Sequence, residues 1–212
     1  MEPTERVGEQ LNRAKMFHNF VIEEYPKGTY KGTLRNRLFI ALCDLELEHH
    51  GAVLTLVESA QHNGSALALL RPIAETCHRA FWTLYCANEQ RIPLIVGGTK
   101  QFPEFEACRA AVEQHFTDQK HGGIFTMSHG YAGQLHGLTH TGMEQLQFRF
   151  DGEFNNRPTY PDKPICTLLQ QATMWLAMTA IAHMQLIEGT EHVLSPNTDR
   201  ITNEYIQLFG AG

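Results

Sequence analysis

The segment 164–187, PICTLLQQATMWLAMTAIAHMQLI, limits the folds open to this chain more than any other part of it. It contains no Asp, Glu, Lys or Arg, and it is long enough to cross a membrane as a helix. Gln170, Gln171 and His183 argue against a span, because each would leave a polar group in hydrocarbon. A helix that is apolar on nearly all sides is typical of the centre of a bundle. We therefore expect an all-α protein with no membrane partner and with Pro164 at the first position of its central helix.

Short Gly, Pro and Asn breaks divide the rest of the chain into further predicted helices. Thr33 is expected to cap the second helix and Ser65 the third. The apolar spacing of the second helix predicts one buried stripe, made of Leu38, Leu42, Leu45, His49, Val53 and Leu56. The predicted helices cover about 4–24, 33–61, 65–88, 104–116, 128–150 and 164–187, and an irregular loop is expected around 91–103.

With 212 residues, the chain is long enough for one domain with a sizeable core. We predict a single-domain helical bundle of five to seven helices with an up-down core. Residues 1–32 would form an N-terminal helix and linker, 33–190 the core bundle, and 191–212 a C-terminal tail or helix. No nucleotide-binding or hydrolase motif occurs in the strand-to-helix context that its chemistry requires.

The net charge of -6 gives the chain no general attraction to nucleic acid or to an anionic membrane. Binding to a polyanion would need a local basic patch. The obvious one is Lys27, Lys31, Arg35 and Arg37, and the simplest interpretation of these side chains is a solvated loop and helix start.

The five cysteines form no CxxC pair and lie among apolar residues, as buried free thiols do. This pattern indicates a reducing compartment. The N-terminal stretch MEPTERVGEQLNRAK lacks the apolar core of a secretory signal. We therefore expect a cytoplasmic protein.

The third predicted helix carries a polar stripe beside its apolar one, formed by Arg71, Glu75, His78 and Trp82. Arg71 and Glu75 are one turn apart and can form an ion pair. Pro72 has no backbone N–H, so it frees the carbonyl four residues earlier. The stripe is either the wall of a polar pocket or an internal ion pair that fixes helix packing.

Residues 129–142, HGYAGQLHGLTHTG, place His129, His136 and His140 seven and four apart, so on a helix all three point the same way. His136 and His140 have the spacing of a two-histidine metal chelate, and Glu144 follows one turn later. Glycines on the adjoining face would let another backbone or a ligand approach closely. The segment is therefore a ligand or catalytic face, a metal site, or a tight helix crossing flanked by neutral histidines.

Two Glu-x-x-His motifs keep a metal-binding bundle open as an alternative, because di-metal carboxylate bundles use such pairs on separate helices. In this alternative a divalent metal such as zinc, iron or manganese is bound. The ligands would be Glu46, His49, Glu75, His78, His136, His140 and Glu144, with Glu188 as a further carboxylate.

Two segments, LALLRPIAETCHRAFWTLYCA and YAGQLHGLTHTGMEQLQFRF, resemble a group of uncharacterised bacterial all-helical proteins. That group has a Leu-Arg-Pro-x-x-Glu helix, and a second helix with an aromatic residue before a His that is followed by Gly or Thr. The resemblance covers about 110 of the 212 residues and implies a helical fold. The positions carried over are Arg71, Glu75, Tyr131, His140 and Thr141.

The bundle also loosely resembles the HEPN class, whose members are often metal-independent ribonucleases of bacterial toxin and defence systems. Their motif is an Arg and a His separated by four to six residues, and a polar residue usually follows the Arg. Arg71 and His78 fit the spacing, although Pro72 follows the Arg. Arg13 with His18 and Arg109 with His115 fit the spacing as well.

This resemblance implies a ribonuclease or nucleotide-processing effector that works without a cofactor, commonly as a homodimer, on RNA. A neutral His would take the proton of a ribose 2′-hydroxyl, and Arg71 would stabilise the charged transition state. The candidate catalytic residues are Arg71, Glu75, His78, His136 and His140, and the candidate ligand-binding residues are Tyr131, Thr141 and Trp82. The alternatives are the metal-binding bundle and a non-catalytic interaction or regulatory subunit that binds a partner protein.

Overall fold

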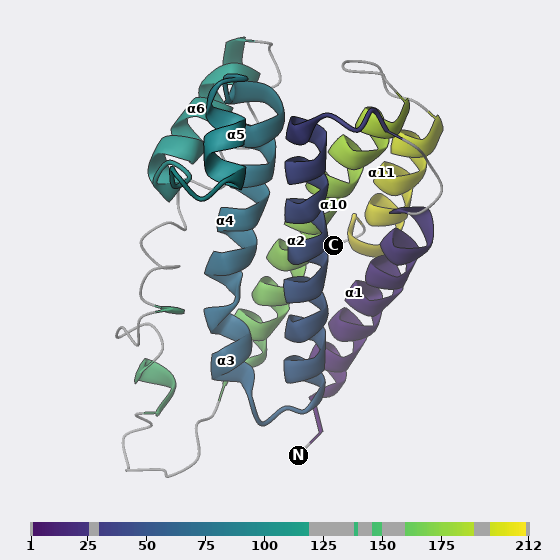
Figure 1. Cartoon of the computed structure of the whole chain (residues 1–212). Coiled ribbons are helices and arrows are strands. Elements are labelled where there is room, and N and C mark those ends of the chain that lie inside the picture. Colours follow the sequence, from purple (N-terminus) through teal and green to yellow (C-terminus); the bar gives the residue numbers. More distant parts are fainter. Residues whose placement is uncertain are drawn as a thin grey trace.

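The computed structural model describes residues 2–25, 30–118, 138–139, 146–149, 160–188 and 196–210, and every regular element in these ranges is helical. Figure 1 shows long helices packed side by side, with shorter ones across one end. The predicted all-α bundle is therefore confirmed. The elements are α1 (Glu5–Glu24), α2 (Leu34–Glu58), α3 (Asn63–Ala68), α4 (Leu70–Phe81), the π-helix η2 (Trp82–Cys86), α5 (Arg91–Val96), α6 (Phe105–Asp118), the 3-10 turn η3 (Gln147–Arg149), α10 (Asp162–Glu188) and α11 (Pro196–Phe209).

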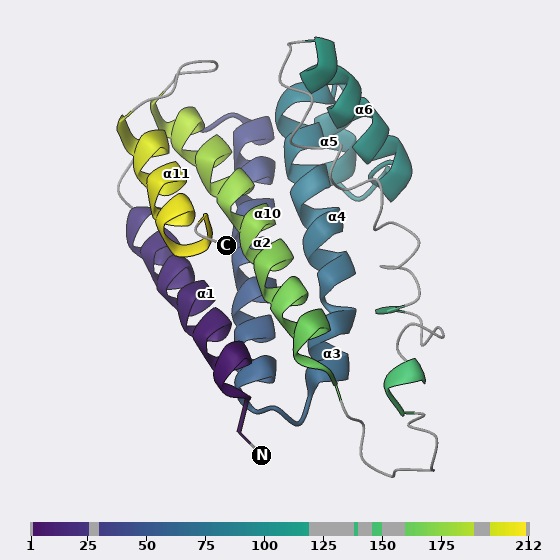
Figure 2. The same cartoon turned by 180° about the vertical axis from the view of Figure 1, so that it is seen from behind.

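Helix α10 is the centre of the bundle, as its sequence predicts. It packs against α1, α2, α4 and α11, and Figure 2 shows it running across the molecule between them. Trp175 and Leu176 are fully buried in this helix. It is long and apolar enough to span a membrane by composition, but 67% of its most apolar window is buried inside the bundle. The prediction that Pro164 begins this helix is wrong, because α10 begins at Asp162. Pro164 is its third residue, where a backbone N–H has no helical acceptor.

Side-chain caps fix the starts of the first two long helices. The Thr4 hydroxyl accepts a hydrogen bond from the Val7 N–H at 3.4 Å, and the Thr33 hydroxyl accepts one from the Asn36 N–H at 3.2 Å. The predicted cap at Thr33 is confirmed. The predicted cap at Ser65 is wrong, because α3 already begins at Asn63 and Ser65 lies inside it.

The buried face of α2 differs from the predicted stripe. Leu42 and Val53 are buried as expected, but Leu45 is 40% exposed. The buried residues are Phe39, Leu42, Cys43, Glu46, His50, Val53, Leu54 and Val57. Two stripes offset by one residue are almost equally apolar in α2. Packing against α1, α4 and α10 selects the one that contains Phe39 and Cys43.

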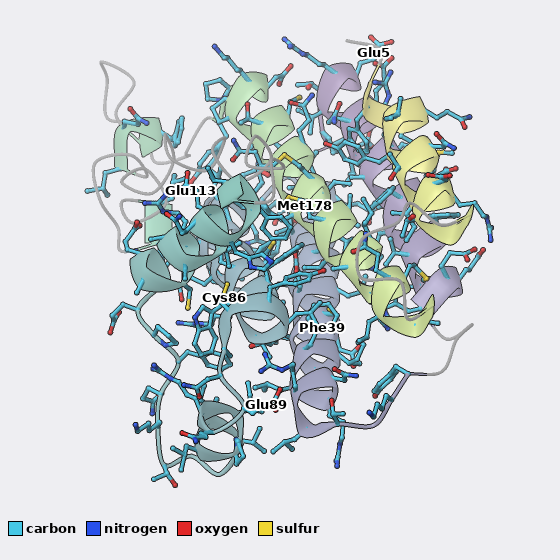
Figure 3. All side chains as sticks on the ribbon, turned by 90° about the horizontal axis from the view of Figure 1, so that it is seen from above. Glu5, Phe39, Cys86, Glu89, Glu113 and Met178 are labelled. Carbon is cyan, nitrogen blue, oxygen red and sulfur yellow. The ribbon has the colours of Figure 1, made fainter. Side chains whose placement is uncertain are left out.

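The loop expected around 91–103 is partly helical. Residues 91–96 form α5, and regular structure is absent only from 97–104. Pro93 suggested a break, but it lies in the first turn of α5, where proline is tolerated. α6 packs on α4 and η2, and the view in Figure 3 places Cys86 and Glu113 on this side of the molecule, away from Glu5.

The C-terminal residues 196–209 form a helix, α11, which packs on α10 and α1. Arg200 donates to both carboxyl oxygens of the buried Glu24, at 2.9 and 3.2 Å. This ion pair ties the end of α1 to the start of α11.

Candidate functional site

Only part of the polar stripe predicted for the third helix is found on α4. Arg71 and Glu75 form an ion pair that Arg79, a residue outside the predicted stripe, extends, whereas His78 and Trp82 are buried. Arg71 Nε donates to Glu75 Oε1 at 2.8 Å, and an Arg79 nitrogen lies 3.0 Å from Glu75 Oε2. All three side chains are partly exposed, at 20–33%. Glu75 precedes Arg79 by four residues, which is the favoured order on a helix. A carboxylate held by two arginines keeps both guanidinium groups oriented.

Pro72 produces the break that its sequence position predicts. Ala68 is four residues before Pro72, so no helical N–H is available to the Ala68 carbonyl. The helix is interrupted there between α3 and α4. The Thr139 hydroxyl donates to the Ala68 carbonyl at 3.3 Å. Leu138 also packs against the main hydrophobic core.

His78 lies in the interior, and this corrects its assignment as a catalytic residue. Its side chain is 0% exposed, between α4 and α6, with the ring edge-on to Phe105 at 5.3 Å. Nδ1 donates to the Ala74 carbonyl at 2.7 Å. Burial, the largest influence, lowers the pKa of His78 and keeps it neutral. A histidine so enclosed cannot reach a substrate, so its role is in packing.

Trp82, a predicted ligand-binding residue, is buried at the first position of the π-helix η2. Arg91 lies over its ring. The predicted site residues of the His-rich segment lie outside the described residues, namely Tyr131, His136, His140 and Thr141.

The metal-binding alternative draws no support from the described residues. Glu46 faces the core, whereas His49 is only partly buried. Among the residues that the structure describes, no three or more His, Cys, Asp or Glu side chains are grouped to hold an ion. His136, His140 and Glu144 lie outside the described ranges.

The interior contains a hydrogen-bonded chain that the sequence analysis missed. The Thr173 hydroxyl donates its only proton to the Leu169 carbonyl at 2.7 Å. His50 Nε2, 3.0 Å from that hydroxyl oxygen, must therefore be the donor of the next bond. His50 is neutral, because burial and then the nearby His18 lower its pKa to about 3. Its Nδ1 is thus an acceptor, and His18 Nδ1 donates to it at 3.1 Å.

Geometry supports this chain. The two imidazole rings are nearly parallel, at 18°, with centres 5.2 Å apart. A Cβ at Gly51 would lie 3.3 Å from the His18 ring, so glycine allows the ring to rest on α2. His18 is the outermost member of the chain and is only partly buried.

A second buried polar group lies one turn away along α2. Both carboxyl oxygens of Glu46, the Tyr25 hydroxyl and His183 Nδ1 are buried and have no hydrogen-bond partner in the described part of the chain. The Tyr25 and His183 rings meet edge to face, with centres 4.2 Å apart. Burial raises the pKa of Glu46 well above its usual range, so the neutral acid is favoured.

The Thr179 hydroxyl donates no hydrogen bond to Glu46, because its proton is used by backbone carbonyls. The hydroxyl lies close to Glu46 and Tyr25, but it donates to the carbonyls of Trp175 and Leu176 at 3.3 and 3.1 Å. Sequence patterns did not predict the buried polar group around Glu46, because the threonines and His183 of α10 look like interruptions of an apolar helix. The spacing of Glu46 and His50, one turn apart on α2, was the available signal.

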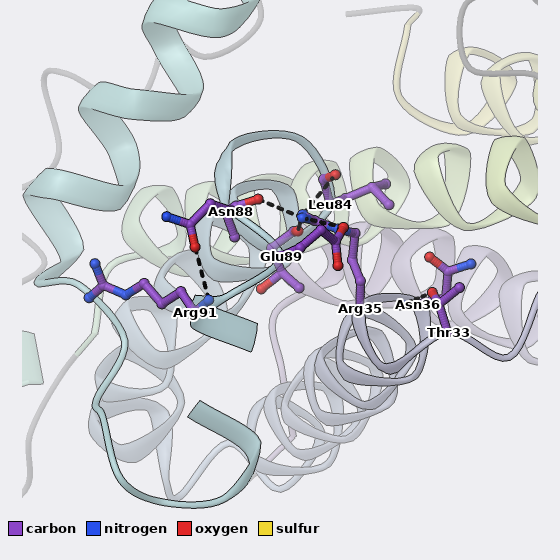
Figure 4. Close-up of polar contacts among 9 residues, drawn as sticks. Thr33, Arg35, Asn36, Leu84, Asn88, Glu89 and Arg91 are labelled. Atoms are coloured by element: carbon purple, nitrogen blue, oxygen red, sulfur yellow. Dashed lines mark hydrogen bonds and ion pairs between the residues drawn. The ribbon is translucent and has the colours of Figure 1, made fainter. Parts of the chain in front are cut away.

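The predicted basic patch is partly committed to the fold. The Arg35 guanidinium donates to the carbonyls of Thr83 and Leu84 and to that of Ala87 at 2.6 Å (Figure 4). It also pairs with Glu89 at 2.8 Å. These carbonyls end the π-helix and have no helical donor. Arg35 is therefore a structural cap and unavailable to a polyanion.

Residues 43–210 match the model of a protein family described as a family of unknown function, DUF6988. The matched range includes α4, α6, α10 and α11, and it omits α1 and the start of α2. No curated protein and no solved structure matches the chain.

Proposed function

The chain belongs to DUF6988, a family of unknown function, and we propose that it is a metal-independent ribonuclease of HEPN-like type. The site would combine Arg71 and Glu75 of α4 with His136 and His140. The substrate would be RNA in the cytoplasm, and a second copy of the chain would complete the active unit.

One contact supports the proposal more than any other, the hydrogen bond from the Thr139 hydroxyl to the Ala68 carbonyl. Ala68 is three residues before Arg71, which is less than one helical turn. Thr139 is next to His140 in the sequence. The contact brings Thr139, a described member of this segment, to the end of α4 that carries the Arg71–Glu75 pair, and this supports the proposal.

The proposed reaction is an internal transesterification. A neutral histidine, His140 in this proposal, takes the proton of a ribose 2′-hydroxyl, and the 2′-oxygen attacks the adjacent phosphorus. The bond to the 5′-oxygen breaks, and His136 donates a proton to that leaving group. The products are a 2′,3′-cyclic phosphate and a 5′-hydroxyl. Arg71 stabilises the extra negative charge on phosphorus, and Glu75 holds its guanidinium in place.

The test is cleavage of a labelled single-stranded oligoribonucleotide in the presence of a chelator. Arg71→Lys keeps the charge but loses the planar fork, and it is expected to lower the rate by about 10²–10³-fold. His140→Ala is expected to lower it by about 10²–10⁴-fold. Arg6→Gln, at an exposed arginine of α1, a helix that packs on α2, α10 and α11, is the matched control and should cleave at the wild-type rate.

A non-catalytic interaction subunit is the second candidate, and the double pairing of Glu75 favours it. Glu75 binds two arginines of its own helix, which serves packing without any substrate. This candidate predicts no chelator-resistant cleavage by the wild-type chain and a lower melting temperature for Arg71→Ala. A ribonuclease instead requires variants that remain folded and lose the reaction.

A further inference from the structure

Two arginines and two aromatic rings form a compact group where α4, η2 and α5 meet the segment before α6. Arg79 Cζ lies over the Phe102 ring, 5.6 Å from its centre, and Arg91 Cζ lies over the Trp82 ring at 5.3 Å. The two rings contact each other edge to face, with centres 6.2 Å apart. Each guanidinium group thus lies over one ring of a contacting aromatic pair.

Each guanidinium group has a buried Nε without a hydrogen-bond acceptor. Arg79 Nε and Arg91 Nε are buried and have no partner within the described residues. Arg79 pairs with Glu75 through another nitrogen at 3.0 Å, and Arg91 makes one long bond to the Gln101 carbonyl at 3.4 Å. A guanidinium has five N–H donors, and leaving buried donors without acceptors is costly. The arrangement is incomplete without an acceptor.

The two arginines also act on the same neighbour, the Cys108 thiol. Burial, the largest influence, raises the pKa of Cys108 to about 11, while Arg79 and then Arg91 act in the opposite direction. Both positive charges are therefore near one neutral group on α6. Cys108 Sγ itself donates to the Pro103 carbonyl at 3.5 Å, so it supplies no negative charge.

Arg91 is separate from the Arg35 cap, although Arg35 bonds to the carbonyls of the turn that precedes Arg91. In Figure 4 the Arg91 side chain extends away from Arg35 and Glu89. Its backbone N–H is held by the Asn88 side chain at 2.9 Å. The start of α5 is therefore fixed, and the Arg91 guanidinium is directed toward the aromatic pair.

We propose that Arg79 and Arg91 form an anion site that binds a phosphate group beside the contacting rings of Trp82 and Phe102. Arginine is suited to phosphate because its planar fork donates two parallel hydrogen bonds. Two guanidinium groups from different helices match a tetrahedral group with several acceptor oxygens. The phosphate could come from a free mononucleotide or from an RNA backbone, and both share this chemistry.

The site lies beside the proposed catalytic pair, because Glu75 pairs with both Arg71 and Arg79. Arg71 and Arg79 are eight residues apart on α4, a rise of about 12 Å along the helix. A phosphate at Arg79 and Arg91 is a binding event, so it is tested without any cleavage. It can hold if the ribonuclease proposal fails, and it can fail if that proposal holds.

The experiment titrates the full-length protein with inorganic phosphate at constant ionic strength and follows tryptophan emission. The chain has two tryptophans, and Trp175 is fully buried in the core, whereas Trp82 lies under Arg91. We expect a saturable emission change that is absent from Trp82→Phe. Arg91→Gln and Arg79→Gln should each weaken binding by about tenfold or more, since each removes charge-assisted hydrogen bonds. Arg6→Gln, with the same change of charge at an exposed position of α1, should bind as the wild type does.

A second arm compares adenosine, adenosine monophosphate and a labelled oligoribonucleotide by competition. Displacement of phosphate by the monophosphate and not by adenosine identifies a nucleotide source, and displacement by the oligoribonucleotide alone identifies a backbone. The proposal is overturned if phosphate leaves the emission unchanged, if adenosine binds as tightly as its monophosphate, or if Arg6→Gln weakens binding as much as Arg91→Gln. Melting curves establish that each variant is folded, and Arg91→Lys replaces Arg91→Gln if the latter is not.

Discussion

At the scale of single residues, Glu46 has the surroundings least suited to its charge. Its side chain is 0% exposed, and neither carboxyl oxygen has a hydrogen-bond partner in the described ranges. A buried carboxylate without a donor is strongly disfavoured relative to the neutral acid. Glu46 therefore stabilises the fold only while it is protonated.

Replacing Glu46 with Gln removes this pH dependence. Burial raises the folded-state pKa of Glu46, so its contribution is complete below the unfolded pKa of about 4.3 and is lost as pH rises toward the folded value. Each unit of elevation costs about 1.4 kcal/mol above that range. We expect E46Q to be more stable than the wild type in urea unfolding at pH 8, by at least about 1 kcal/mol, and to show no advantage at pH 4.

The exposed variant Glu48→Gln is the control, and it should change the free energy of unfolding by less than about 0.5 kcal/mol at either pH. A destabilised E46Q at pH 8 would contradict the argument, because it would mean that the ionised carboxylate is well solvated or paired in the folded protein.

Spacing along one helix predicted contacts within α4 but not which side chains are buried by other helices. The Arg71–Glu75 pair followed from its i, i+4 spacing, and the free Ala68 carbonyl followed from Pro72. Whether His78 faces solvent depends on α6, which is nearly thirty residues further along the chain, and no local pattern contains that information. The same holds for Glu46, whose surroundings come from α10.

At the scale of the elements, only some caps and breaks were predictable, and the buried face of a helix was less so. The Thr33 hydroxyl starts α2 as predicted, whereas Ser65 lies inside α3 and caps no helix. Pro93 was misread because proline can either break a helix or occupy its first turn, and the difference lies in the packing of α5 on α2. The buried face of α2 was selected by three neighbouring helices at once.

The break between α3 and α4 gives a prediction at this scale. Thr139→Val removes the donor to the Ala68 carbonyl and should cost about 0.5–1.5 kcal/mol of stability. In a Pro72→Ala background the N–H of residue 72 can bond to that carbonyl, so the same substitution should cost almost nothing. Urea unfolding of the two single variants and the double variant measures the coupling.

Equal costs of Thr139→Val in both backgrounds would show that the hydroxyl does not depend on the proline break. Thr55→Val serves as the matched control. Its hydroxyl donates to the Gly51 carbonyl within an unbroken helix, so its cost should be the same with or without Pro72.

At the scale of the whole molecule, α1 is integral to the bundle although the family match begins at residue 43. Phe17 and Val21 are fully buried against α10 and α11. Without α1, a large apolar face of α10 would be open to water. Large exposed apolar patches lead to association between protein molecules.

A chain that starts at Tyr30 tests the role of α1. We expect it to have a lower melting temperature than the full chain, to bind a hydrophobic dye, and to elute as oligomers in size-exclusion chromatography with light scattering. A truncated chain that elutes like the full-length protein and melts at the same temperature would show that α1 is only an accessory to the bundle.

The direction of the hydrogen bonds from His18 through His50 and Thr173 to Leu169 has a consequence for isotope exchange. Every proton in this series of hydrogen bonds points inward, and the series ends at the Leu169 carbonyl, which has no proton to pass on. The three groups therefore act as aligned dipoles rather than as a route for protons. In heavy water, the buried His50 and Thr173 protons can be replaced only when α1 and α10 separate from α2. Their rate of replacement would report directly how often the bundle opens.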